Sequence, residues 1–160
     1  MPTFKIKLTG KGFFSPESMR RRKEAMALVL LRQTQERILA GGDEEYTFPP
    51  LDFPRKDGST NQPLLGNRTI YESLYATADS DRFGVKSRFI GARIQQEGTV
   101  GKGGKLRTIR PKRAKVLAFQ GPGGRIIFAR KVDIRPRHYL RLTQGDKAEL
   151  VQTFANPQQV

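Results

Sequence analysis

The sequence predicts an α+β fold: a small antiparallel sheet with a long N-terminal helix and a C-terminal helix, plus an extended arm and loops. Residues 16–40 and 143–154 have the apolar spacing and end signals of helices. Residues 3–8 and 83–88 alternate apolar and polar side chains, as half-buried strands do. Two apolar runs flank a Pro/Gly turn at residues 120–124, which predicts a β-hairpin. We expect a single domain, residues 1–160, with a modest core.

The long helix has marked ends. Ser15 offers a hydroxyl for the N-cap, Pro16 suits the first helical position, and Gly41 begins the glycine pair that ends the helix. A cationic run at residues 20–23 lies near the positive end of the helix dipole, which is unfavourable. We interpret this run either as a surface kept for a partner or as solvated charge. One face carries the residues expected in the core, namely Ala27, Leu30, Leu31, Thr34 and Ile38.

Residues 43–64 have no periodicity and are rich in proline, which predicts an extended arm. A free linker would not need the aromatic side chains that this arm carries. We expect the arm to pack on its own domain or on a neighbouring subunit, with Phe48 and Phe53 among its contact residues.

The middle and end of the chain carry short elements. Residues 69–78 fit a short helix beginning near Asn67, which we prefer, or a strand. Residues 89–98 predict a short helix closed by Gly98, and residues 116–119 and 125–130 form the two strands of the hairpin. The C-terminal helix should be capped by Asp146, with Glu149 three residues on.

The stretch of residues 132–142 is the part of the chain expected to present a docking surface. Alternation at residues 132–135 predicts a strand that continues from the hairpin, and Pro136 should end it. The apolar side chains after the proline would then fix a corner that displays arginines. The residues predicted to dock a partner here are Arg135, Arg137, Tyr139 and Arg141.

Composition limits the possible functions. The net charge of +15 favours acidic partners such as nucleic acid, an anionic membrane or an acidic protein surface. The absence of cysteine excludes disulfides and thiolate metal sites, which fits a reducing cytoplasm. No stretch approaches the ~20 apolar residues of a membrane span, and residues 1–10 lack the apolar core of a secretory signal.

Nothing in the sequence predicts catalysis, a cofactor or a metal site. His138 is the only histidine, and it lies between Arg137 and Tyr139 with no catalytic partner nearby in the sequence. The glycine-lysine run at residues 101–105 is similar to a phosphate-binding loop, but the required Ser or Thr after a Gly-Lys pair is missing.

Residues 98–115 form a glycine-rich basic loop. Three interpretations of this loop are open. It could bind phosphate backbones without sequence preference, it could be a solvated loop extended by its own charge repulsion, or it could become ordered on an acidic protein. The loop has no aromatic side chain for base stacking, which argues against a sequence-specific RNA reader. Its candidate contact residues are Lys102, Lys105, Arg107, Arg110, Lys112 and Arg113.

Three blocks, taken in order, resemble a known family. They are PLLGNRTIYESL at residues 63–74, FIGARIQQEG at 89–98 and VDIRPRHYLRL at 132–142. Together they are similar to the virion morphogenesis, or tail completion, proteins of contractile-tailed bacteriophages, the family with the phage Mu member. The resemblance covers about residues 51–154, and the N-terminal helix that precedes them stands in the place expected for the family. Gln95–Gln96 stands where the family has a histidine-glutamine pair.

The resemblance implies a non-enzymatic structural protein of the virion neck or tail end, present in the host cytoplasm during assembly. Such proteins form rings, commonly sixfold, that finish the tail and meet the head connector. The arm at residues 43–64 and the loop at residues 98–115 would then reach neighbouring subunits, and the corner arginines would meet acidic tube, sheath or neck proteins. Cations lining a passage could also touch DNA without sequence preference. The alternative is a basic RNA-binding protein of the ribosomal type, which the charge and the basic loop favour.

Overall fold

The computed structural model describes residues 3–7, 14–50, 64, 69–120 and 125–159. It confirms the α+β class, with a three-stranded antiparallel sheet, two two-stranded sheets and helices at both ends of the chain. In chain order the elements of the first half are β1 (Thr3–Lys7), α1 (Pro16–Ala40), β2 (Gly42–Asp43), β3 (Tyr46–Thr47), α2 (Thr69–Ser73) and β4 (Leu74–Ala78). Those of the second half are β5 (Arg82–Ser87), α3 (Ala92–Glu97), η2 (Val100–Lys102), β6 (Leu117–Gln120), β7 (Ile126–Ala129), α4 (Gln144–Ala155) and η4 (Pro157–Gln159).

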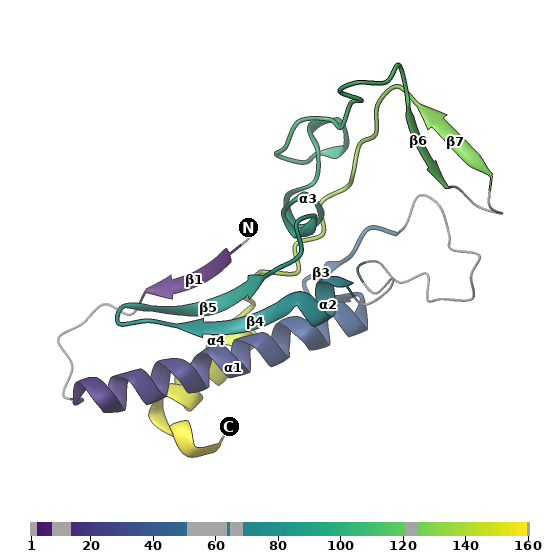
Figure 1. The fold of residues 1–160 in the computed structure, drawn as a ribbon. Coiled ribbons are helices and arrows are strands. Elements are labelled where there is room, and N and C mark those ends of the chain that lie inside the picture. Colours follow the sequence, from purple (N-terminus) through teal and green to yellow (C-terminus); the bar gives the residue numbers. More distant parts are fainter. Residues whose placement is uncertain (1–2, 8–13, 51–63, 65–68, 121–124, 160) are drawn as a thin grey trace.

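The three-stranded sheet lies on α1, and α1 also contacts α4 (Figure 1). We call this part of the molecule the base. Strand order is β1-β5-β4, with both pairs antiparallel, so β5 is the central strand. Phe83 and Val85 of β5 are almost fully buried against the helix. All five residues predicted for the core face of α1 pack there, with Leu31 partly and the other four fully buried. None of the described helices is both long and apolar enough to cross a membrane.

The ends of α1 follow the sequence signals. The Ser15 Oγ accepts from the Ser18 amide at 3.2 Å, and Gly41 ends the helix in the left-handed conformation with φ of 79°. The cationic run at residues 20–23 makes ion pairs and hydrogen bonds within the chain. Arg20 and Arg21 form i,i+4 ion pairs on the surface, and Lys23 is buried, donating to the Ser80 carbonyl.

Two predictions about short elements need correction. The preferred helix over residues 69–78 is wrong in its second half, because only Thr69–Ser73 is helical and Leu74–Ala78 is strand β4. Pairing with β5 and burial of Leu74 against the base outweigh local helix propensity. At the C-terminal helix, Thr143 is the N-cap and Asp146 is the third helical residue, and the two side chains form a capping box.

A second lobe projects away from the base (Figure 1). It contains η2 and the predicted hairpin, whose strands pair Leu117 with Ala129 and Gln120 with Ile126. Residues 132–142, here called the strap, return from this lobe to the base along α3 (Figure 1). The predicted strand at residues 132–135 is wrong: the described residues of this stretch form only an isolated bridge between Val132 and Ile109.

The strap is irregular because its hydrogen-bond partners belong to a helix and its flanking loop. The Thr99 amide donates to the Ile134 carbonyl, and the Ile134 amide donates to the Thr99 hydroxyl, both at 2.8 Å. One residue past Pro136, the Arg137 amide donates to the Gln95 carbonyl at 2.7 Å. These bonds satisfy the strap backbone without a neighbouring strand.

Candidate assembly surfaces

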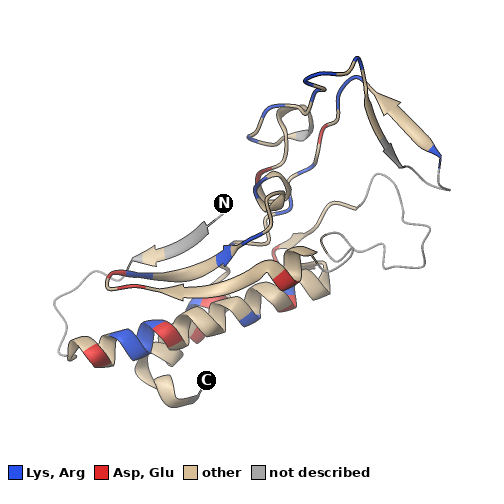
Figure 2. Ribbon diagram, in the orientation of Figure 1, with Lys and Arg blue, Asp and Glu red and all other residues tan. Residues whose placement is uncertain are grey.

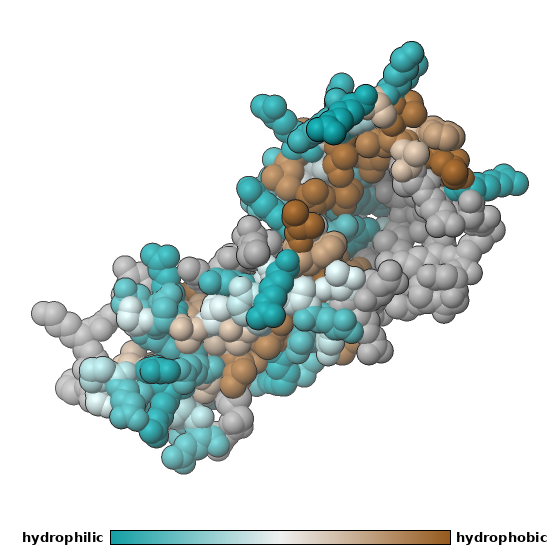
Figure 3. Space-filling model, in the orientation of Figure 1, coloured by the Kyte–Doolittle hydropathy of each residue, from teal (hydrophilic) through white to brown (hydrophobic). Residues whose placement is uncertain are grey.

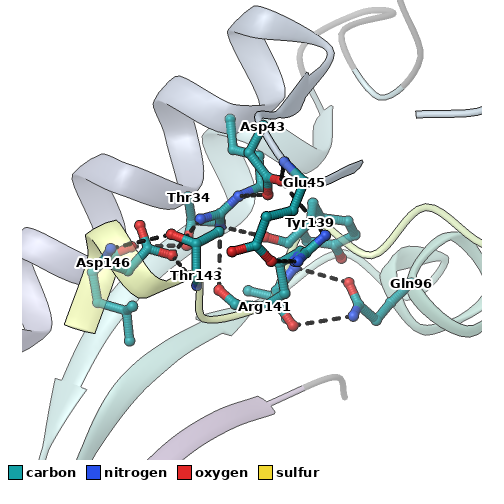
Figure 4. Close-up of polar contacts among 11 residues, drawn as sticks. Thr34, Asp43, Glu45, Gln96, Tyr139, Arg141, Thr143 and Asp146 are labelled. Carbon is teal, nitrogen blue, oxygen red and sulfur yellow. Dashed lines mark hydrogen bonds and ion pairs between the residues drawn. The ribbon is translucent and has the colours of Figure 1, made fainter. Parts of the chain in front are cut away.

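Arg37, in the last turn of α1, is the centre of a buried polar network, and Figure 4 shows its partners Asp43, Tyr139, Arg141 and Asp146. Its Nε lies 2.7 Å from an Asp43 carboxylate oxygen, and its Nη2 lies 2.5 Å from an Asp146 carboxylate oxygen. Its Nη1 donates to the carbonyls of Tyr139 and Arg141 at 3.1 and 3.3 Å. One planar guanidinium thus joins α1, β2, the strap and α4, and its charge is balanced by two carboxylates.

Arg141 extends this network to the surface. Its guanidinium pairs with Asp43 at 3.5 Å and with Glu45, and it lies over the Tyr46 ring, 5.7 Å from the centroid. The Tyr46 hydroxyl donates to the Pro136 carbonyl at 2.8 Å, and its ring also packs against His138. Arg141 and His138 therefore help to hold the strap on the β2–β3 turn.

Arg137 holds the opposite side of the strap. Its guanidinium donates to the carbonyls of Pro49 and Pro50 and to the Gln95 side chain, at 3.0 to 3.3 Å. With 6% of its surface exposed, it cannot serve as an accessible docking residue. The expectation that the corner displays three arginines is therefore wrong for Arg137; its charge fixes the start of the arm to the chain itself. Arg135 is exposed, and Arg141 is half-buried.

Tyr139 is fully buried, so its predicted docking role is wrong as well. Its hydroxyl donates to the Ala92 carbonyl of α3 at 3.2 Å. The neighbouring Leu140 exchanges two hydrogen bonds with the Gln96 side chain, at 2.9 and 3.2 Å. Burial raises the pKa of the Tyr139 phenol well above its ordinary value of 10.0. The phenol therefore stays a proton donor inside the fold.

This pKa shift predicts a loss of stability in alkali. Because the folded-state pKa is raised, the unfolded phenol ionises first, and the free energy of unfolding falls as pH rises above 10, by up to about 1.4 kcal/mol per pH unit. Tyr139→Phe should lower stability at pH 8 but weaken this alkaline loss, as measured by urea unfolding at pH 8 and 11. Tyr75→Phe on β4 is the matched control, and an equal weakening there would contradict the assignment to Tyr139.

The projecting lobe, residues 98–131, is here called the cationic lobe. It has ten lysines and arginines and no acid, and Figure 2 shows them along the loops that lead into and out of the hairpin. Each of its described cationic side chains is exposed and forms no ion pair with a described residue. They are Lys105, Arg107, Arg110, Lys112, Arg113, Lys115, Arg125, Arg130 and Lys131. The basic loop predicted from the sequence is thus on the surface; the Lys102 side chain lies outside the described residues.

The hairpin of this lobe exposes apolar side chains between the cations. Ile126 and Phe128 point to the same face of β7, and each is 65% exposed. Figure 3 shows hydrophobic residues at the surface of the lobe with hydrophilic ones projecting around them. A lone two-stranded hairpin is only marginally stable in water, so burial of these apolar side chains by another surface would stabilise it.

An open acidic groove of about 540 Å³ lies between the end of α1, the β2–β3 turn and the start of α4. Six of the chain's 15 acids line it: Glu36, Asp43, Glu44, Glu45, Asp146 and Glu149. Sequence reasoning missed this groove. The acidic run at residues 43–45 was a signal, but the acids of α1 and α4 join it only through folding.

The predicted arm is described only in part. Phe48 is buried, 4% exposed, and belongs to the core of this chain, so it packs on its own domain. Phe53 lies outside the described residues. Among the described residues no cluster of histidine or acidic side chains could hold a metal ion.

No protein-family model, no curated protein sequence and no solved structure matches the chain. The resemblance to phage tail completion proteins therefore stays a prediction. The case for function rests on the chain's own surfaces.

Proposed function

We propose that this chain is a structural virion protein, without enzymatic activity, that completes the phage tail end and helps to form the head-tail joining surface as a ring of subunits. One observation of the molecule carries the proposal. A two-stranded hairpin projects from the base and exposes Ile126 and Phe128 among cations that form no ion pair with a described residue. Such a hairpin is expected to become stable when another chain covers it.

The interior of the molecule supports the same proposal. Arg37 and Arg137, which could have served a ligand, are buried and bonded within the fold. Nine exposed cations of the described residues lie on the cationic lobe, where they suit binding to an acidic protein surface. The family resemblance supplies the setting, the neck of a contractile-tailed phage.

The test in the virus is deletion of the gene followed by electron microscopy of the lysate. We expect filled heads beside unjoined tails, because the tail end would lack its joining surface. Normal infectious particles would overturn the proposal.

A hairpin variant tests the surface itself. Phe128→Lys should leave the unfolding free energy within about 0.5 kcal/mol, since the side chain is exposed. It should nevertheless fail to restore joined particles to the deletion phage, because a charge would enter the covered face. Val151→Lys on α4, at a site 68% exposed, is the matched control and should restore them. Full complementation by the Phe128 variant would contradict a role for the hairpin.

The second candidate is an RNA-binding protein of the ribosomal type. The specific observation in its favour is the run of exposed cations with no acid at residues 98–131. Gel retardation of generic RNA at about 0.15 M salt separates the two functions, because exposed phosphate contacts are largely screened there. A retarded RNA band at this salt concentration supports an RNA-binding protein, and an RNA band that runs free supports the virion protein.

A further inference from the structure

We propose that the cationic lobe of one copy docks into the acidic groove of the next copy, so that the chain assembles head to tail. The inference rests on the proposed ring function and names the two surfaces that would form its subunit contact.

The groove keeps an excess of negative charge in a protein with a net charge of +15. Its six lining carboxylates face three arginines: Arg37, which lines the groove, and Arg32 and Arg141, which pair with its acids. Three negative charges are therefore left over. Glu44 is exposed and has no ion pair with a described residue, so it is available to a cation from outside.

Gln33, on the groove wall, has an unsatisfied acceptor. Its side-chain nitrogen donates to Glu149 at 2.6 Å, while its amide oxygen is buried and has no hydrogen-bond partner among the described residues. The residue is only 8% exposed, and leaving a buried oxygen unpaired is unfavourable. A lysine or arginine entering the groove would bring the missing donor, after a small turn of the amide.

The cationic lobe offers what the groove lacks. Its cations have no acid within residues 98–131 to compensate them, so they repel one another unless an acidic surface approaches. The exposed Ile126 and Phe128 provide apolar contact area beside these cations. Charge selects the partner and its orientation, and the hairpin adds buried apolar surface.

The two surfaces belong to different parts of the chain, with the lobe projecting from the base and the groove between α1, β2 and α4 (Figure 1). A contact between two different surfaces of identical chains is heterologous. Such a contact repeats from copy to copy and closes as a ring when the rotation allows, whereas one self-complementary patch would give a two-fold dimer. The proposed contact therefore predicts a ring rather than a dimer.

Charge reversal tests the contact in the purified full chain. The groove variant is Glu36→Lys with Glu44→Lys, and the lobe variant is Lys112→Glu with Arg113→Glu. All four side chains are exposed, so folding should be unchanged, as judged by unfolding temperature. Sedimentation and native mass spectrometry at low salt should show that each variant needs a protein concentration at least about 10-fold higher than wild type to assemble.

The variant that carries all four reversals is the decisive one. Its lobe, now negative, meets a positive groove on the next copy, so the two surfaces attract each other again. The protein concentration needed for assembly should then return to within about 3-fold of the wild-type value. Two double variants of equal charge change, Glu72→Lys with Asp81→Lys and Arg82→Glu with Arg88→Glu, lie outside both surfaces and should assemble as wild type does.

Three results would overturn the inference: a wild-type chain that is monomeric at every concentration, single-surface variants that assemble normally, or a fourfold variant that stays as weak as its parents. A lobe reversal that abolishes only binding to nucleic acid or to an acidic virion protein would overturn it too. Complementation of the deletion phage separates this from the proposed function. If the gene is needed for joining but the reversal variants give one of these overturning results, only the contact is wrong and the proposed function stands.

Discussion

Arg37→Ala is expected to destabilise the fold by about 3–5 kcal/mol, the cost of removing one partner from a buried ion pair. The change leaves the carboxylates of Asp43 and Asp146 without their main counter-charge, and these side chains are only 14% and 8% exposed. It also frees the carbonyls of Tyr139 and Arg141. Since domains of this size are stable by only about 5–15 kcal/mol, the substitution should remove a large part of the total free energy of unfolding. Urea unfolding followed by circular dichroism measures the loss.

Two comparisons isolate the cause. Arg32→Ala removes an arginine that also bonds two carboxylates but is about half exposed, and it should cost about 1 kcal/mol or less. Arg37→Lys keeps the charge but cannot supply the same fork of donors, so it should fall between wild type and Arg37→Ala. Equal losses for Arg37→Ala and Arg32→Ala would mean that the buried network adds nothing.

Gly98→Ala is expected to detach the strap from α3. Gly98 has φ of 63° and ψ of −174°, a conformation reserved almost entirely for glycine, and forcing alanine into it costs about 1–3 kcal/mol. A Cβ there would also lie 2.5 Å from the Pro136 nitrogen and 2.8 Å from the Ile134 oxygen, and relieving such overlap costs about 1–3 kcal/mol more. Hydrogen exchange at the Thr99 and Arg137 amides, which bond across this junction, should increase most.

Gly103→Ala is the matched control for this substitution. Gly103 also has a positive φ, 77°, but apart from its two chain neighbours no described residue has an atom within 4 Å of the position its Cβ would take. It should cost only the left-handed strain of about 1–2 kcal/mol and leave the strap amides protected. If both variants lost the same stability, crowding at Gly98 would not be the reason.

The parts of the fold predicted from sequence are those whose signals are local. The ends of α1 follow from Ser15, Pro16 and Gly41, and the hairpin follows from two apolar runs around a Pro/Gly turn. Strand β5 shows the alternation of a sheet whose one face lies on a helix. In each case the residues that decide the structure are neighbours in the chain.

The failures come from contacts between distant residues. The sequence of β4 fits a strand as well as a helix, and the helix is preferred wrongly because the pairing of this segment with β5 and its packing on α1 leave no local mark. The strap was predicted as strand because its alternation is real, yet its partners are Thr99 and Gln95 rather than another strand. Periodicity shows that a segment is half-buried but does not identify what covers it.

Among the candidate surfaces, too, those with a local sequence signal were predicted and those formed by distant residues were not. The cationic loop is where the sequence predicted it, because a long run of cations with no acid cannot be buried. Arg137 is expected on the surface as part of a corner that displays arginines, but four acceptors surround its guanidinium inside the fold. The acidic groove could not be predicted, because Glu36, Asp43 and Glu149 come from three separate elements.

The sequence separation of the Arg37 contacts has a consequence for biosynthesis. Asp43 is only six residues away, but Tyr139, Arg141 and Asp146 follow Arg37 by 102, 104 and 109 residues. While the nascent chain is still on the ribosome, the arginine has one of its two counter-ions, and the wall supplied by Glu149 does not yet exist. Prematurely terminated chains would lack that wall altogether. In the proposed head-to-tail contact, a copy could therefore receive its neighbour only after its translation has finished, and truncated chains would be left out of the assembly.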